Sequence, residues 1–304
     1  EPVSEMLTRL GAELHIPESQ RLPSGEFASC PTPNPETDSA FDENYKLAAQ
    51  CRPDIILATD PDSDRIAAAI PVGGGFRKLS GNEMGCLLLD YILRNLKKNG
   101  TLPEKPVAVK SIVSTPLADR IAAALGCEMR TVLTGFKYIG GVILELEEQG
   151  CPERFVLGFE ESCGYLKGDY ARDKDAVVTA MLIAEMAASY KLEGRTLGDV
   201  MDGLYDEYGH FATGLQNVQF TSDAQKEHCM ALMEALRRQP PEAVAGFPVT
   251  AVTDFRAGVE TVRESGAQRP TGLPQENMVM LTLGEQGRVI LRPSGTEPKI
   301  KFYY

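Results

Sequence analysis

The chain has 304 residues, with 31 basic and 43 acidic side chains and a formal net charge of −12 at pH 7. This length exceeds what one hydrophobic core usually occupies and indicates two or three domains. The acidic balance argues against a surface for nucleic acid or anionic membrane, and the sequence contains no run of eighteen apolar residues that would predict a membrane span.

The seven cysteines are odd in number, scattered and without a C-x-x-C pair. A zinc site or disulfide framework is therefore not expected, and a reducing cytoplasm is the predicted location. The chain opens on glutamate without the regions of a targeting signal, and it stops at KIKFYY, which resembles a strand cut short. From these ends we expect a fragment of a longer protein.

Strand and helix patterns alternate through the first two-thirds of the chain, which is typical of layered α/β domains with mixed sheets. After a proline-bearing segment and a helix within residues 30–51, the predicted strands cover residues 54–59, 106–114, 128–135 and 154–159. Helices are predicted over residues 116–125, 137–149 and 175–192. A further helix within residues 193–209 has Thr196 as its expected N-cap and Asp199 as the partner of a capping box.

A smaller C-terminal α+β domain is predicted next. Its strands cover residues 211–220, 247–255, 277–284 and 287–294, around one helix at 222–239. The sequence GEQG at 284–287 predicts a hairpin turn. The expected domains are residues 1–76, residues 77–195, and a linker helix with the last domain at residues 196–304.

Four motifs lie at strand ends, where open α/β sheets bind their ligands. In the first, TDPDSDR, three aspartates alternate along a turn ahead of Arg65, so the carboxylates of Asp60, Asp62 and Asp64 can converge on one divalent ion. Mg²⁺ suits such hard oxygen ligands when phosphate or water completes its shell. The structural alternative is a solvated acidic loop.

The second motif, LTGFKYIGG, places Thr134, Gly135 and Lys137 between a strand and a helix. Backbone amides at a helix start and one ammonium group form a modest anion site, and a plain helix cap explains the same residues.

The third motif, LGFEESCGYLKGDYARDKDAV, follows another strand. Glu160 and Ser162 offer acceptor and donor groups suited to sugar hydroxyls, while Arg172 and Lys174 add positive charge at the start of the long helix. A surface loop with incidental charges is the alternative.

The fourth motif, ILRPSGTEPKIK, combines a guanidinium, two hydroxyls, free amides and an ammonium within eight residues. The residues are Arg292, Ser294, Gly295, Thr296 and Lys299. This combination suits one phosphate group, and the alternative is a turn at a hairpin edge.

In sequence, spacing and order, these four motifs together resemble the α-D-phosphohexomutase superfamily, in particular its phosphoglucomutase and phosphopentomutase branch. The resemblance covers essentially the whole chain. It implies that the first 76 residues end domain 2, that residues 77–195 form domain 3, and that residues 196–304 hold most of domain 4.

The resemblance also implies roles for residues near the reacting group. Asp60, Asp62 and Asp64 match the aspartates that hold Mg²⁺ in these enzymes. Arg65 would lie near the transferred phosphoryl group, and Lys174 matches a lysine close to bound substrate.

Substrate-binding roles follow from the same resemblance. Glu160 and Ser162 would bind the 3- and 4-hydroxyls of the sugar, with Thr134, Gly135 and Lys137 in the neighbouring loop. The phosphate that is not transferred would contact a loop formed by Arg292, Ser294, Gly295 and Thr296.

One element of the family is missing from this sequence. The nucleophile of these enzymes is a phosphorylated serine in a motif of the form Thr-Ala-Ser-His-Asn-Pro, which does not occur in the 304 residues. The segment CPTPNPE contains Asn34 and Pro35 but has no serine or histidine at the matching positions. We therefore expect the fragment to be inactive alone, and no general base is identified among His15, His210 and His228.

The activity implied for the full-length enzyme is that of an isomerase acting by intramolecular phosphotransfer in carbohydrate metabolism. A phosphoserine would donate its phosphoryl group to a sugar phosphate, giving glucose 1,6-bisphosphate as intermediate and activator. The sequence EES favours glucose phosphates, whereas the mannomutase-like branch has Glu-Met-Ser-Gly-His and the glucosamine branch Glu-Gln-Ser-Gly-His. Phosphopentose is the alternative substrate, because it presents a similar diol.

Two other functions are weighed against this one. A phosphatase of the haloacid dehalogenase type also begins with an apolar strand and Asp-x-Asp, but it needs a buried strand just before Gly168, and GYLK is a poor strand sequence. It also leaves RPSGTEPK unexplained. A sugar-phosphate-binding module without catalysis remains open for the fragment, because every binding element is present.

Overall fold

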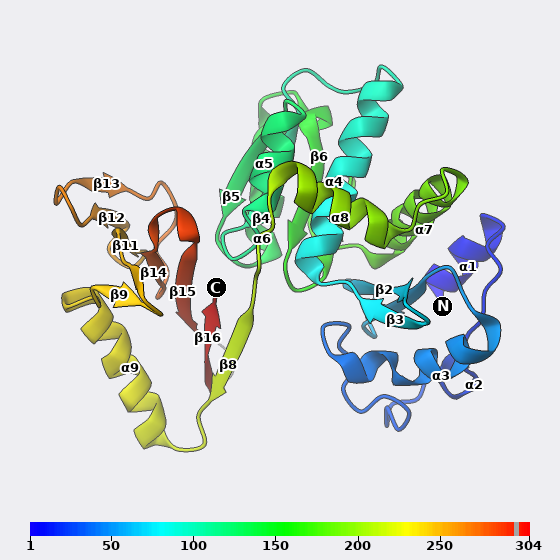
Figure 1. Cartoon of the computed structure of the whole chain (residues 1–304), viewed down its shortest axis with the longest axis horizontal. Helices are drawn as coiled ribbons and strands as arrows, with labels where there is room; N and C mark the ends of the chain where they lie inside the picture. Colours follow the sequence, from blue (N-terminus) through cyan, green and yellow to red (C-terminus); the bar gives the residue numbers. More distant parts are fainter. Residues whose placement is uncertain (295–297) are drawn as a thin grey trace. The chain divides into compact units, whose positions relative to one another are not determined.

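Two groups of elements make up the structure, a computed structural model that describes residues 1–294 and 298–304. The first unit spans Glu1–Phe211 and the second Ala212–Tyr304, and each is described by itself (Figure 1). Among the described residues, no helix has both the length and the apolar character needed to cross a bilayer.

The first unit contains helices and two sheets. Its helices are α1 (Pro2–Arg9), α2 (Glu18–Arg21), η1 (Asp38–Phe41), α3 (Asp42–Cys51), α4 (Gly81–Lys98), α5 (Leu117–Ala124), α6 (Phe136–Glu148), η2 (Pro152–Arg154), α7 (Ala176–Leu192) and α8 (Leu197–Tyr208). Its strands are β1 (Ile56–Thr59), β2 (Ile66–Val72), β3 (Gly75–Lys78), β4 (Val107–Ser111), β5 (Glu128–Val132), β6 (Phe155–Glu160) and β7 (Gly164–Leu166).

A four-stranded mixed sheet with the order β5-β4-β6-β7 is the middle layer of an α/β/α arrangement (Figure 1). Strand β4 pairs in parallel with β5 and β6, while β7 pairs antiparallel with β6. Ala108 of β4 packs in the same apolar cluster as α4 and α5, whereas its neighbours Val107 and Val109 pack with α6. Because helices cover both faces, β4 is buried along its whole length.

The other sheet of this unit is antiparallel, in the order β1-β2-β3. The first five residues of β2, Ile66–Ile70, are at most 1% exposed and share one apolar core with residues of α4, α7 and α8. The loop between β1 and β2 holds the three aspartates of the first motif.

The second unit has one seven-stranded antiparallel sheet in the order β13-β12-β11-β14-β15-β16-β8. Its elements are β8 (Leu215–Gln219), α9 (Asp223–Arg238), β9 (Ala243–Val244), β10 (Phe247–Pro248), β11 (Ala251–Asp254), β12 (Val259–Val262), β13 (Gln268–Pro270), β14 (Val279–Thr282), η3 (Gly284–Gln286), β15 (Arg288–Pro293) and β16 (Lys299–Tyr303). Helix α9 packs on this sheet through Cys229 and Met233. This arrangement is the α+β class expected from the sequence.

The multidomain α/β fold class is confirmed, as are all the helices and strands that the sequence predicts. Thr196 and Asp199 form the predicted capping box at the start of α8. The sequence assigned this helix to a linker, but Leu197, Val200 and Met201 pack in the core of the first unit. The domain boundaries at 76 and 195 stay predictions.

Candidate active site

The loop between β1 and β2 is shaped by the side chain of Asp60. One of its oxygens, Oδ1, accepts hydrogen bonds from the backbone N–H groups of Asp64 at 3.1 Å and Arg65 at 3.0 Å. Ser63 adopts a left-handed conformation with a φ of 57°, which turns the chain back so that the next two N–H groups face Asp60. The loop is thus folded around a buried carboxylate by its own hydrogen bonds.

The carboxylates of Asp60, Asp62 and Asp64 each offer one oxygen, and these oxygens lie within 4.8 Å of one another. Two oxygens on opposite sides of a Mg²⁺ ion are separated by about 4.2 Å, since each Mg–O bond is about 2.1 Å. Asp62 is exposed, so its side chain has freedom to close the difference. The donor set therefore fits a hard divalent cation.

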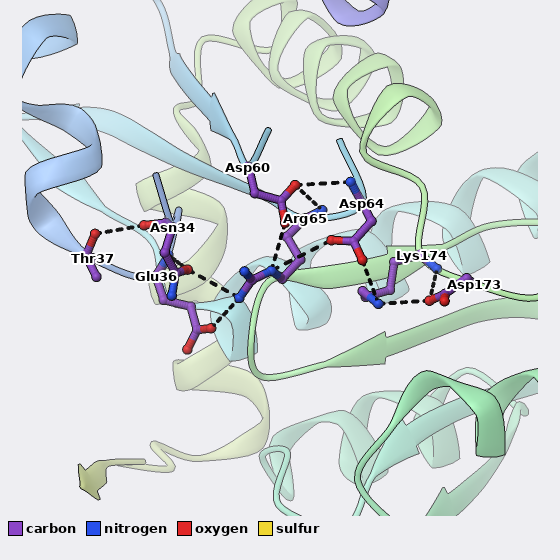
Figure 2. A network of polar contacts seen from close by, with 8 residues as sticks. All are labelled: Asn34, Glu36, Thr37, Asp60, Asp64, Arg65, Asp173 and Lys174. Atoms are coloured by element: carbon purple, nitrogen blue, oxygen red, sulfur yellow. Dashed lines mark hydrogen bonds and ion pairs between the residues drawn. The ribbon is translucent and has the colours of Figure 1, made fainter. Parts of the chain in front are cut away.

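Two basic side chains neutralise part of this charge (Figure 2). The Nε of Arg65 donates to Oδ2 of Asp60 at 2.9 Å, and the Nζ of Lys174 lies 2.8 Å from Oδ2 of Asp64. Lys174 also pairs with Asp173 at 2.8 Å. Residues from the first and third motifs therefore meet at one place.

Burial and hydrogen bonding shift the pKa values of these groups. Burial alone would raise the pKa of Asp60, but hydrogen bonding with Asp64 and Arg65 outweighs it and lowers this pKa. Burial and the neighbouring Asp60 raise the pKa of Asp64, against the effect of Lys174. The pKa of Lys174 rises, because its bonds to Asp173 and Asp64 outweigh its burial.

Backbone contacts fix the loop of the third motif, between β6 and β7, against the loop between β1 and β2. The N–H of Ile66 donates to the carbonyl of Cys163 at 3.0 Å, and Arg65 forms an antiparallel bridge with Gly164. A Cβ atom on Gly164 would lie 2.3 Å from Cδ of Lys174. Glycine therefore provides the space through which the lysine reaches Asp64.

The second and third motifs also meet in the first unit. Oε1 of the buried Glu160 accepts a hydrogen bond from the N–H of Gly135 at 2.6 Å, at the start of α6. The hydroxyl of Thr134 is buried and has no hydrogen-bond partner among the described residues. Ser162 is half-buried, and Lys137 is exposed with its Nζ over the ring of Tyr138.

Glu161 is a residue of this site that the sequence analysis did not select. Its Oε2 accepts from the hydroxyl of Ser111 at 2.9 Å, and that hydroxyl also bonds to Ser114 at 2.8 Å. Burial, and then the charge of Glu160, raise the pKa of Glu161 to about 7. The sequence shows that Glu161 lies between Glu160 and Ser162, but it does not show in which direction the side chain points.

The fourth motif lies in the second unit, at the hairpin of β15 and β16. The Nε of Arg292 donates to Oε1 of Glu276 at 2.5 Å, and the N–H of Ser294 donates to the carbonyl of Lys299 at 2.8 Å. Gly295 and Thr296 lie outside the described residues.

Strand β7 corrects one expectation from the sequence. GYLK is a poor strand sequence, but Gly164–Leu166 forms a buried strand because it pairs with β6. The weakness of this strand therefore does not argue against a haloacid dehalogenase-type phosphatase.

The order of domains decides the family. Residues 1–73 match the alpha/beta/alpha domain II of phosphoglucomutase/phosphomannomutase, residues 80–208 match its alpha/beta/alpha domain III, and residues 242–304 match its C-terminal domain. The chain belongs to the α-D-phosphohexomutase superfamily. This membership, rather than the sequence of β7, sets the phosphatase interpretation aside.

Curated members of the superfamily resemble the chain over nearly its full length. A phosphoglucomutase of Staphylococcus haemolyticus is 36% identical over 278 residues, which is 91% of this chain and 49% of the relative. A phosphoglucomutase of Staphylococcus aureus is 33% identical over 303 residues, covering 99% of this chain and 53% of the relative. The chain spans about half the length of the curated relatives it matches.

Solved structures of the superfamily share the fold. The open form of parafusin, a phosphoglucomutase from Paramecium, matches with a TM-score of 0.61 at 18% identity, over 89% of this chain and 45% of that one. A putative phosphomannomutase from Thermus thermophilus matches with a TM-score of 0.53 at 20% identity, over 89% and 46%.

Proposed function

We propose that the protein is a phosphoglucomutase-type isomerase that interconverts hexose 1-phosphate and hexose 6-phosphate by intramolecular phosphotransfer. The observation that carries the proposal is the meeting of three aspartates, Arg65 and Lys174 beside the loop between β6 and β7. Membership of the superfamily and the curated phosphoglucomutase relatives support it.

We assign Asp60, Asp62 and Asp64 as ligands of Mg²⁺, because their oxygens gather in a hard donor set. When bound, the ion supplies positive charge that stabilises a phosphoryl group during transfer. Arg65 and Lys174, which lie against two of these carboxylates, are assigned to the phosphoryl group and the substrate.

The sugar would be oriented by the third motif. Glu160 is fixed by the N–H of Gly135, so its carboxylate is held in place to accept from sugar hydroxyls, with Ser162 beside it. The buried hydroxyl of Thr134 is a polar group suited to a ligand atom, since no described residue satisfies it. Lys137 adds positive charge to the same loop.

In the second unit, Arg292, Ser294, Gly295 and Thr296 are assigned to the phosphate that is not transferred. Such a loop must accept either phosphate of glucose 1,6-bisphosphate, the proposed intermediate and activator. Amides, hydroxyls and a guanidinium suit this task, because they recognise phosphate irrespective of the sugar.

We propose that these 304 residues bind sugar phosphates but do not turn them over alone. No residue among them matches the nucleophilic serine of the family. Without that covalent acceptor, the two-step route through a bisphosphate has no phosphoryl donor.

For the substrate, we propose glucose phosphates, with pentose phosphates as the alternative. The EES sequence at residues 160–162 and the curated phosphoglucomutase relatives both favour glucose. A preference of tenfold or more in kcat/KM for mannose 1-phosphate would contradict this, as it corresponds to about 1.4 kcal/mol of discrimination. The cytoplasm is the proposed location, since all seven cysteines are free thiols.

The test is an assay of glucose 1-phosphate conversion to glucose 6-phosphate, with Mg²⁺ and catalytic glucose 1,6-bisphosphate. It is run on this chain and on a longer protein that carries the serine motif. We expect the longer protein to convert the substrate and the 304-residue chain not to. Turnover by the 304 residues would place the nucleophile among them, and no turnover by either would indicate a binding protein.

A further inference from the structure

The segment Asn34–Thr37 contains the Asn-Pro-Glu sequence that the proposed function leaves without a role. It forms a closed turn. The side-chain oxygen of Asn34 accepts from the N–H of Glu36 at 3.0 Å, and its carbonyl accepts from the N–H of Thr37 at 2.9 Å. Pro35 is buried, and the Nζ of Lys78 in β3 donates to the carbonyl of Glu36 at 2.5 Å. The turn is therefore anchored to the sheet.

This turn presents two acceptors to Arg65, as Figure 2 shows. The Nη1 of Arg65 lies 2.8 Å from Oε1 of Glu36 and 3.3 Å from Oδ1 of Asn34. The Nε of the same guanidinium donates to Asp60 at 2.9 Å. Two nitrogens of one planar group are thus fixed by acceptors from two separate segments.

The remaining nitrogen, Nη2, has no acceptor among residues 1–294 and 298–304. A guanidinium held at Nε and Nη1 cannot rotate freely, so the direction of its Nη2 donors is set. An arginine that is ordered before its ligand arrives loses less freedom on binding.

We propose that Glu36, held by the Asn34 turn, is a positioning residue that orients Arg65 to donate from Nη2 to a phosphoryl oxygen. This inference rests on the proposed function, which assigns Arg65 to the phosphoryl group. Glu36 also carries a negative charge, which by itself opposes phosphate. Positioning and charge therefore predict opposite effects when the residue is replaced.

The experiment titrates inorganic phosphate into the 304-residue chain with Mg²⁺ present. Binding is followed by NMR at the side-chain Nε–H signal of Arg65, which is assigned from its absence in Arg65→Lys. A local signal separates this site from phosphate bound in the second unit. Glu36→Gln and Glu36→Ala both remove the charge, but only glutamine keeps an oxygen that accepts from Nη1.

We expect Glu36→Ala to bind phosphate about fivefold more weakly than Glu36→Gln, which corresponds to ordering one side chain. Glu36→Asp retains the charge but shortens the side chain, and it should also weaken binding about fivefold relative to the unmodified chain. If Glu36→Ala does not fold, the comparison of Glu36→Asp with the unmodified chain decides the question. Glu18→Gln, which removes the carboxylate partner of Arg21 elsewhere, should leave the Arg65 signal and the affinity unchanged.

Equal phosphate affinities for Glu36→Gln and Glu36→Ala, or an unchanged affinity for Glu36→Asp, would overturn the positioning role of Glu36. The assignment of Arg65 to the phosphoryl group would be unaffected. If the Arg65 signal of the unmodified chain does not shift when phosphate is added, the assignment of Arg65 in the proposed function is wrong. The inference about Glu36 then fails as well.

Discussion

The Nζ of Lys174 lies 2.8 Å from Oδ2 of Asp64, so a side chain of the protein itself already neutralises one of the three gathered carboxylates. A cation at this distance competes with a metal ion for the same oxygen. Lys174→Met should therefore bind Mg²⁺ at least about threefold more tightly, as removal of one nearby like charge favours the ion.

Calorimetry at low ionic strength measures this effect. Lys191→Met is the matched control, because Lys191 pairs with the exposed carboxylate of Asp54 at 2.7 Å. An unchanged or weaker Mg²⁺ affinity in Lys174→Met would show that the lysine does not compete with the ion.

Replacing Asp62 tests the proposed metal site without disturbing the fold. The residue is exposed and has no hydrogen bond or ion pair within the described part of the chain. Asp62→Asn should weaken Mg²⁺ binding by about tenfold or more, since a ligand carboxylate is lost, while the free energy of unfolding changes by less than about 0.5 kcal/mol.

Calorimetry and urea unfolding measure the two quantities. Asp206→Asn makes the same change of charge at an exposed position of α8 and should leave Mg²⁺ binding unaltered. Equal Mg²⁺ affinities in Asp62→Asn and the unmodified chain would remove Asp62 from the ligand set.

Glu161 predicts a dependence of stability on pH. The pKa of its carboxyl is raised to about 7 in the folded chain, whereas the ordinary pKa of a glutamate is 4.5. Between these values the unfolded chain binds fewer protons than the folded one, so the free energy of unfolding falls as pH rises. The fall attributable to Glu161 is at most about 3.5 kcal/mol, since each unit of pKa shift is worth about 1.4 kcal/mol.

Urea unfolding of the first unit from pH 4.5 to pH 8 measures this contribution. Glu161→Gln should lack it, so the stability of this variant relative to the unmodified chain should rise over that range. Glu148→Gln, at an exposed position of α6, serves as the control. A constant difference between Glu161→Gln and the unmodified chain would mean that Glu161 ionises normally.

Arg292 is expected to contribute phosphate binding in the second unit. Arg292→Ala should weaken binding of inorganic phosphate by about 1.5 to 3 kcal/mol, as expected for a charge-assisted hydrogen bond. The unit should also become less stable, because Glu276 loses its arginine partner.

Phosphate binding is followed by NMR at signals of residues 288–294, with urea unfolding in parallel. Arg256→Ala is the control, since Arg256 pairs with Glu234 in the same unit at an exposed position. Loss of stability without loss of phosphate affinity would make Arg292 a structural residue only.

The sequence could predict which residues gather at the candidate site because of where strands end. Asp60 follows β1, Thr134 follows β5, and Glu160 ends β6, so period and turn signals along the chain were sufficient to select them. The mixed α/β layering followed from the same local patterns.

Contacts between distant segments could not be predicted in this way. Glu36 meets Arg65 across 29 residues, and the direction of the Glu161 side chain depends on Ser111, 50 residues earlier.

Helix α4 was not predicted from the sequence. Its Gly81 and Gly85 disfavour a helix locally, yet a Cβ on Gly85 would lie 2.4 Å from the ring of Phe159. Tertiary packing, which local propensity does not register, requires these glycines.

We propose above all that the loop between β1 and β2 holds Mg²⁺ as part of a sugar-phosphate site. Calorimetric titration of glucose 1,6-bisphosphate into the 304-residue chain, with and without Mg²⁺, tests this most directly. We expect Mg²⁺ to strengthen bisphosphate binding by about tenfold or more, and Asp62→Asn to lose that enhancement. Bisphosphate binding that is the same with and without Mg²⁺, or the same in Asp62→Asn, would contradict the claim.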